Sequence, residues 1–172
     1  MWKRRGNGGL VVALIDSDNV DGVLRDSKKK LDFYKLMKEF LKLGKIHFVF
    51  LFIPFGSYHS LPRVNNLGYE IVVCQKMDTK TKEPEKREDK VDSRMAMVGR
   101  NFLDCQEVGT IVLLTHDKHS LELAGEVLKK GKRLIYFADR ESVSTSPELK
   151  AFWDGYEIEV YPLPSKNREG IV

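Results

Sequence analysis

Apolar and polar residues alternate in blocks along this chain, and the blocks predict strands separated by helices. Apolar runs predict strands at residues 10–15, 47–53, 69–74, 110–114 and 133–137, with a short sixth at 156–161. Helical spacing of apolar residues between these runs predicts amphipathic helices, most clearly at Phe33, Leu36, Met37, Phe40 and Leu41. The alternation predicts an α/β fold of three layers, with a central parallel sheet of five or six strands and helices on both faces.

Glycine and proline mark where the predicted elements begin and end. Gly44 and Gly131 are placed to stop helices, and Ser146-Pro147 is a typical helix start. A polar stretch containing Asp21 and Gly22 follows the first strand, and a short helix is expected within residues 57–66. We divide the chain into a basic N-terminal tail (1–9), one domain (10–161) and a C-terminal tail (162–172) that we expect to be loose.

Composition narrows the class of protein. The chain has 172 residues, of which 42% are hydrophobic and 31% charged, as in one soluble globular domain. Its apolar runs are shorter than the roughly 20 residues that cross a bilayer, so we expect no membrane segment. Cys74 and Cys105 are far apart and lack zinc-site spacing, which favours a reducing, cytoplasmic location. Gly6, Gly8 and Gly9 precede the first strand, so they do not form a dinucleotide-binding turn.

Carboxylates follow two of the predicted strands. Asp16 and Asp18 come after the first strand, Asp117 after the fourth, and Asp92 lies at the start of the helix before the fourth. In a doubly wound sheet the first and fourth strands are neighbours, and their ends open onto one crevice. Carboxylates gathered there repel one another unless a cation lies between them. Oxygen ligands suit Mg²⁺ or Mn²⁺, which can assist hydrolysis of a phosphodiester.

Each of these residues also has an ordinary structural interpretation. Asp is common in turns and helix caps. His119 is a candidate ligand, base or phosphate contact, or simply a polar residue at a helix start, and Lys90 is a candidate phosphate contact or a solvated lysine. The net charge of +4 and a hydrophilic loop suggest contact with a nucleic-acid backbone, although acids in the loop weaken this case. The basic residues of that loop are Lys76, Lys80, Lys82, Lys86 and Arg87.

The chain resembles the NYN family, the PIN-like metal-dependent ribonuclease domains that include LabA-like proteins. The matching segments are 13–19, 90–92, 111–117, 131–135 and 146–149, in that order. The resemblance implies a PIN-like (Rossmann-like) sheet, a Mg²⁺- or Mn²⁺-dependent RNA-cleaving site and RNA as partner, and it is compatible with a homodimer. It assigns the site to Asp16, Asn19, Asp92 and Asp117, with Asp18 as a further candidate ligand.

One segment departs from the family pattern and leaves alternatives open. The family usually has Ser-Gly-Asp-Ser-Asp-Phe where this chain has residues 115–120, so that His119 replaces the second aspartate and Lys118 adds a cation. A non-catalytic RNA-binding module is therefore an alternative to the ribonuclease. A third interpretation is a phosphatase of the haloacid dehalogenase type, with Asp16 as nucleophile and Asp18 as acid/base.

Overall fold

A six-stranded parallel sheet forms the centre of the protein. The structure, a computed structural model, describes residues 9–55, 64–74 and 90–169, apart from the side chain of Lys90. The strands are β1 (Leu10–Asp16), β3 (Ile46–Pro54), β4 (Glu70–Cys74), β5 (Val108–Leu114), β6 (Arg133–Phe137) and β7 (Glu159–Tyr161). They lie in the order β4-β3-β1-β5-β6-β7 and all pair in parallel. The predicted parallel sheet is thus confirmed, with six strands.

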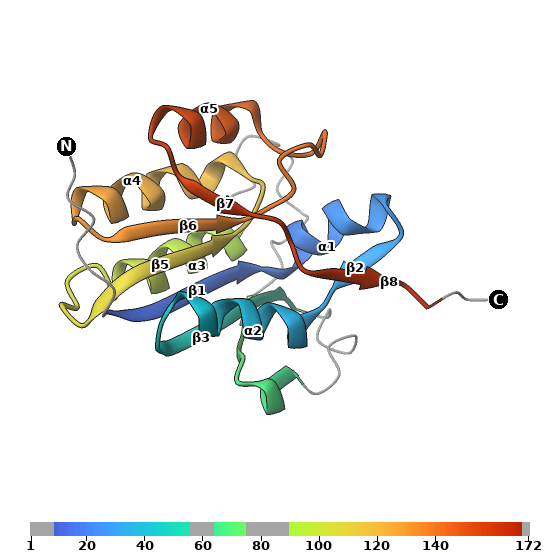
Figure 1. Ribbon diagram of the computed structural model, residues 1–172, viewed down its shortest axis with the longest axis horizontal. Helices are drawn as coiled ribbons and strands as arrows, with labels where there is room; N and C mark the ends of the chain where they lie inside the picture. Colours follow the sequence, from blue (N-terminus) through green and yellow to red (C-terminus); the bar gives the residue numbers. More distant parts are fainter. Residues whose placement is uncertain (1–8, 56–63, 75–89, 170–172) are drawn as a thin grey trace, which may run out of the picture.

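Helices cover both faces of the sheet and complete the predicted three layers (Figure 1). One layer holds α1 (Ser17–Asp26) and α2 (Phe33–Leu43), and the other holds α3 (Lys90–Arg100), α4 (Leu121–Lys129) and α5 (Pro147–Gly155). Each layer packs on its own apolar core, because successive β1 residues point to opposite faces. Among the described residues, every helix is too short or too polar to reach across a lipid bilayer.

Most predicted helix ends are confirmed. α2 ends at Gly44, and Gly131 follows α4 with φ +70°, where its N–H and that of Lys132 bond back to the last turn. The Ser146 hydroxyl caps α5, accepting a hydrogen bond from the Leu149 N–H at 3.4 Å. Of the short helix expected within 57–66, the described residues contain only the 3₁₀ helix η2 (Val64–Leu67), since 56–63 lie outside them.

The stretch after the first strand is helical, so the expectation of a polar connection there is wrong. Asp16 serves as the N-cap of α1, and its carboxylate accepts a hydrogen bond from the Asn19 N–H at 3.2 Å. The apolar side chains Val20, Val23 and Leu24 bury one face of the helix. These residues have the i, i+3, i+4 spacing of an amphipathic helix, and Gly22 within the same stretch masks the signal.

The C-terminal segment is not loose either. Strand β8 (Ser165–Asn167) pairs in antiparallel fashion with β2 (Lys29–Leu31), which directly follows α1. Arg168 extends this contact, because its guanidinium donates to the Lys29 carbonyl at 2.9 Å and to Asp21 of α1 at 2.5 Å. We call this pairing of β2, β8 and Arg168 the C-terminal clasp. It fastens α1 to the end of the described chain.

Two glycines allow the chain to pass closely at the start of β1 and β5. A Cβ atom added to Gly9 would lie 2.6 Å from both the Cα and the N of Gly109. That distance is far below van der Waals contact, and the atoms met are backbone atoms that cannot rotate away. Gly9 is therefore required by packing at the sheet edge.

We expect Gly9→Ala to lower the free energy of unfolding by about 1–3 kcal/mol, the usual cost of overpacking. Gly125→Ala is the matched control: Gly125 lies within α4, and an added Cβ meets nothing within 4 Å. Because alanine favours a helix over glycine, the control should gain roughly 0.5–1 kcal/mol. Urea denaturation measures both, and equal effects in the two variants would contradict the packing argument.

Candidate functional site

The predicted carboxylates leave the sheet from neighbouring strands. β1 and β5 pair with Ile15 opposite Leu114, so Asp16 and the residues after Leu114 emerge side by side at the C-terminal edge of the sheet. This confirms the predicted adjacency of the two strands. Ligands of open α/β sheets bind at this edge.

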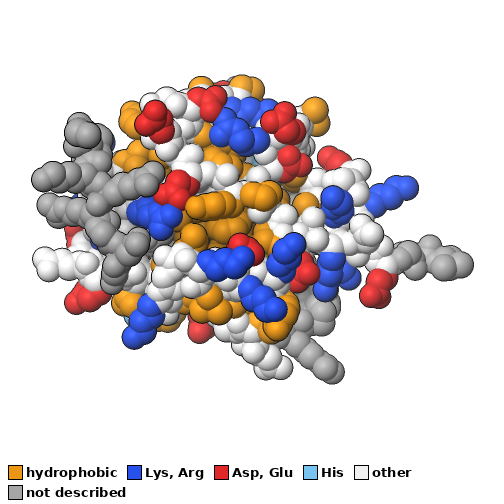
Figure 2. Space-filling model, viewed as in Figure 1, with side chains coloured by type: hydrophobic (Ala, Val, Ile, Leu, Met, Phe, Trp, Pro, Cys, Tyr) orange, Lys and Arg blue, Asp and Glu red, His pale blue; other side chains and the backbone are white. Residues whose placement is uncertain are grey.

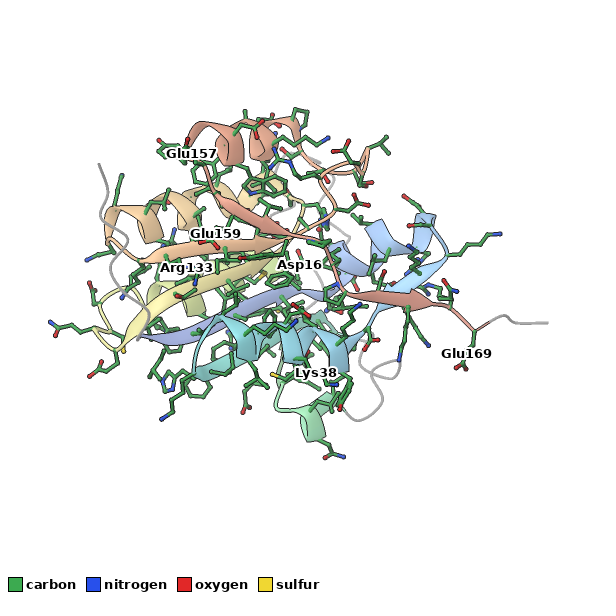
Figure 3. All side chains as sticks on the ribbon, viewed as in Figure 1. Asp16, Lys38, Arg133, Glu157, Glu159 and Glu169 are labelled. Atoms are coloured by element: carbon green, nitrogen blue, oxygen red, sulfur yellow. The ribbon has the colours of Figure 1, made fainter. Side chains whose placement is uncertain are left out.

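Asp16 is almost completely enclosed at the end of β1, where Figure 3 labels it in the middle of the molecule. Only 3% of the residue is exposed, and one of its carboxylate oxygens caps α1. Asp18 lies in the first turn of α1 and is exposed. The negative charge of Asp16 is therefore held close to the N-terminal end of α1, where the helix dipole stabilises it.

Among the described residues, three other side chains form a compact group of candidate ligands. Asp92, Asp117 and His119 each offer one ligand atom, and these atoms all lie within 4.8 Å of one another. Asp92 comes from the first turn of α3, which contacts the short 3₁₀ helix η4 (Lys118–Ser120). Asp117 caps η4, so that its carboxylate accepts the His119 N–H at 3.1 Å, and the His119 ring nitrogen Nε2 lies 3.8 Å from the same oxygen. We call these three residues the acid–imidazole cluster.

The donor set of the acid–imidazole cluster fits a divalent cation. Two opposite metal–ligand bonds of about 2.1 Å span roughly 4.2 Å, and the ligand atoms of the cluster lie within 4.8 Å of one another. Two carboxylates supply hard oxygen ligands, and the imidazole adds a nitrogen that suits transition metals more than Mg²⁺. Asp16 and Asp18 are not in this group of three, although Asp16 adds a further negative charge at the same edge of the sheet.

A shallow cavity of about 270 Å³ adjoins the cluster and shares Asp117 with it. The other residues that line it are Asn19, His116, Lys118, Ser144, Ser146 and Glu148. The Lys118 ammonium lies 3.9 Å from a Glu148 carboxylate oxygen, and the Ser146 hydroxyl donates to the other oxygen at 2.7 Å. The positive charge of Lys118 therefore lies beside Glu148 of α5. The cavity is lined by charged groups of both signs.

A larger hollow of about 700 Å³ lies elsewhere, between α2 and the strands β6 and β7. Leu41, Phe137 and Tyr161 contribute apolar surface there, and Figure 2 shows apolar side chains gathered on this face of the molecule. Arg133 also lines it and donates to Glu159 of the neighbouring strand at 2.8 Å, as the labels in Figure 3 place them. None of the predicted site residues whose side chains the structure describes lines this hollow, so the smaller cavity is the candidate site.

The sequence analysis did not identify His116 as part of the site. It directly continues the buried run of β5 and is completely enclosed. Its ring contacts Asn19 on one side, and on the other it accepts the Asp139 N–H at 2.8 Å. Burial lowers the pKa of His116 from 6.5 to about 4, an effect that the nearby Asp139 charge partly offsets. His116 is therefore neutral at physiological pH.

The remaining predicted contacts lie outside what the structure describes. Lys90 is the first residue of α3, but its side chain is not among the described ones. The basic loop residues Lys76, Lys80, Lys82, Lys86 and Arg87 fall in the segment 75–89, also outside the described residues. Their contact with a nucleic-acid backbone stays a prediction.

Comparisons with known proteins agree with this architecture. The NYN domain family matches residues 11–159. A protein of unknown function from Vibrio parahaemolyticus has the same fold, with a TM-score of 0.71 at 10% identity over 92% of this chain and 95% of that one. A homoserine dehydrogenase from S. aureus matches at 12% identity over 91% of this chain and 33% of that one, with a TM-score of 0.38 that is too low to bear on the fold. No curated protein matches the sequence of this chain significantly.

The buried His116 should make stability depend on pH. In the unfolded chain the imidazole binds a proton below about pH 6.5, whereas in the fold it stays neutral down to about pH 4. The unfolded state therefore binds more protons in this window, so stability falls as the pH falls from 6.5 toward 4. His116→Asn removes the imidazole and with it this dependence of stability on pH. The stability advantage of the wild type over the variant should shrink by about 2 kcal/mol between pH 7.5 and pH 5, as measured by urea denaturation. If the wild type and the variant differed in stability by the same amount at both pH values, His116 would not be held neutral in the folded protein.

Metal binding can be measured without any assay of activity. We expect Mn²⁺ to bind the wild type in calorimetry and Asp117→Asn to weaken that binding at least about tenfold, since even outer ligand partners have effects of this size. Asp104→Asn is the matched control, because Asp104 is exposed and pairs with Lys130 at 2.6 Å, before β5 and at the opposite sheet edge. Equal weakening by both substitutions would argue against binding at the acid–imidazole cluster.

Proposed function

Because the chain belongs to the NYN domain family of PIN-like nucleases, we propose that it is a metal-dependent ribonuclease that hydrolyses RNA phosphodiester bonds. The observation that carries this proposal is the convergence of Asp92, Asp117 and His119 within 4.8 Å of one another at the C-terminal edge of the sheet. Asp92 is far from the other two residues in the sequence, and Asp92 and Asp117 are acids that the sequence pattern had selected.

The position of each residue at the site indicates its role in the proposed reaction. Asp92, Asp117 and His119 would hold Mn²⁺ or Mg²⁺, and Asp16 would add negative charge from the end of β1. When bound, the cation supplies positive charge that offsets the carboxylates and lowers the barrier to attack of water at phosphorus. The imidazole of His119 favours Mn²⁺ over Mg²⁺, since nitrogen ligands suit transition metals. A neighbouring phosphate of the RNA would enter the polar cavity beside Asp117.

Binding of RNA without cleavage is the second candidate function. His119 in place of an acid lowers the negative charge available to a cation, which supports an RNA-binding module that has lost its chemistry. Lys118 gives this alternative less support than the sequence suggested, because its ammonium is near Glu148. The phosphatase alternative has weaker support still: a nucleophilic Asp16 must reach its substrate, and only 3% of that residue is exposed. A homodimer stays a prediction.

Substitution of the acids tests the proposal. Asp92→Asn and Asp117→Asn should each lower Mn²⁺-stimulated cleavage of single-stranded RNA by about 100-fold or more, because each removes a charged ligand. Asp16→Asn is the informative third variant, since asparagine is an equally good N-cap and α1 should stay folded. Its loss of cleavage would report the missing charge.

Asp104→Asn serves again as the control and should cleave at the wild-type rate. Gel analysis of a labelled oligoribonucleotide with and without EDTA measures all four variants. Wild-type protein that binds the oligoribonucleotide, binds Mn²⁺ and leaves the RNA intact would replace the ribonuclease with the RNA-binding module.

A further inference from the structure

Two histidine contacts fix the orientation of the Asn19 side chain. The His116 backbone N–H donates to Asn19 Oδ1 at 2.7 Å, and ring atom Nδ1 of His116 lies 3.1 Å from the same oxygen. His116 comes from the end of β5 and Asn19 from the first turn of α1, so these bonds tie the two elements together. Both residues line the cavity beside Asp117.

The proton positions follow from two groups that can only donate. The Asp139 backbone N–H points at His116 Nε2 at 2.8 Å, so Nε2 accepts and carries no proton. The neutral ring then carries its proton on Nδ1, which donates to Asn19. The His116 backbone N–H likewise requires an acceptor, so the Asn19 atom that faces it is the oxygen and not the nitrogen.

The consequence is that Asn19 offers only donors to a ligand. Its oxygen accepts two hydrogen bonds, which occupy both lone pairs, and among the described residues no hydrogen bond involves the two N–H groups of the amide. An amide NH₂ group does not ligate a cation, whereas a phosphate oxygen accepts hydrogen bonds from it. Lys118 and the hydroxyl of Ser144, on the lining of the same cavity, are donors as well, whereas the Ser146 hydroxyl already donates to Glu148.

We propose that His116 is a positioning residue that locks Asn19 as a hydrogen-bond donor to a phosphate oxygen of the RNA backbone, in the cavity beside Asp117. The inference rests on the proposed function for the identity of the ligand as RNA. It assigns Asn19 to the phosphate rather than to the metal, and it gives the buried histidine a role in binding as well as in packing.

Two substitutions of His116 separate these roles, because each keeps half of the ring's hydrogen bonding. His116→Asn keeps a donor at the position of Nδ1, toward Asn19, and loses the acceptor for Asp139. His116→Gln keeps an acceptor at the position of Nε2, toward Asp139, and loses the donor to Asn19. A merely structural histidine gives no reason for the two variants to differ in RNA binding.

The measurement is fluorescence anisotropy of a fluorescein-labelled single-stranded oligoribonucleotide with the full chain, in EDTA and at fixed salt. We expect His116→Gln to raise Kd about fivefold to tenfold and His116→Asn to stay within about twofold of the wild type. Equal Kd values for the two variants, or a His116→Gln variant that binds like the wild type, would overturn the proposal.

Asn19→Asp keeps the test decisive if neither histidine variant folds. The aspartate retains an oxygen for both His116 donors but replaces the amide N–H groups with a second oxygen, so Kd should rise at least tenfold. Unchanged affinity would overturn the proposal. Because EDTA prevents metal-dependent cleavage, these affinities test the phosphate contact alone. A wild type that binds RNA in this pattern yet fails to cleave with Mn²⁺ would refute the ribonuclease and leave the contact standing.

Discussion

The parallel pairing of β1 with β5 is the constraint on which both the core and the site depend. Its register places Ile15 opposite Leu114, so Asp16 and the segment before Asp117 leave the sheet next to each other. A shift of one residue would turn every β1 side chain to the opposite face, so that Val11, Ala13 and Ile15 would change places with Val12 and Leu14 between the two apolar cores. Gly9 and Gly109 approach each other closely at the other end of the same strands. Packing and placement of the site are thus one requirement.

Burial on both faces explains why much of the fold could be predicted. A parallel strand covered on two sides is a continuous apolar run, and a helix on a sheet has an apolar stripe, so both can be read from local sequence. The acids Asp92 and Asp117 could be selected for the same reason, since each adjoins one of these elements. Their convergence with His119 required the strand order, which a general rule for doubly wound sheets supplied.

Contacts that depend on distant partners could not be predicted in this way. Gly22 hides the helix that follows Asp16, and β8 is a polar segment whose pairing with β2 leaves no pattern in either strand. His116 and His119 lie three positions apart, yet one is enclosed and the other exposed. Only the geometry at the end of β5, where α1 and the loop after β6 meet the ring, distinguishes them.

The C-terminal clasp has a consequence for the order in which the protein is made. α1 carries Asn19 and is capped by Asp16, yet the strand and the guanidinium that fasten it are among the last described residues. A ribosome therefore completes the sheet, the acids and the enclosed imidazole before it releases the segment that secures the helix beside them. A chain that stops before Ser165 would keep the Asp16 cap of α1 and would lose both the β2–β8 pairing and the Arg168 contact.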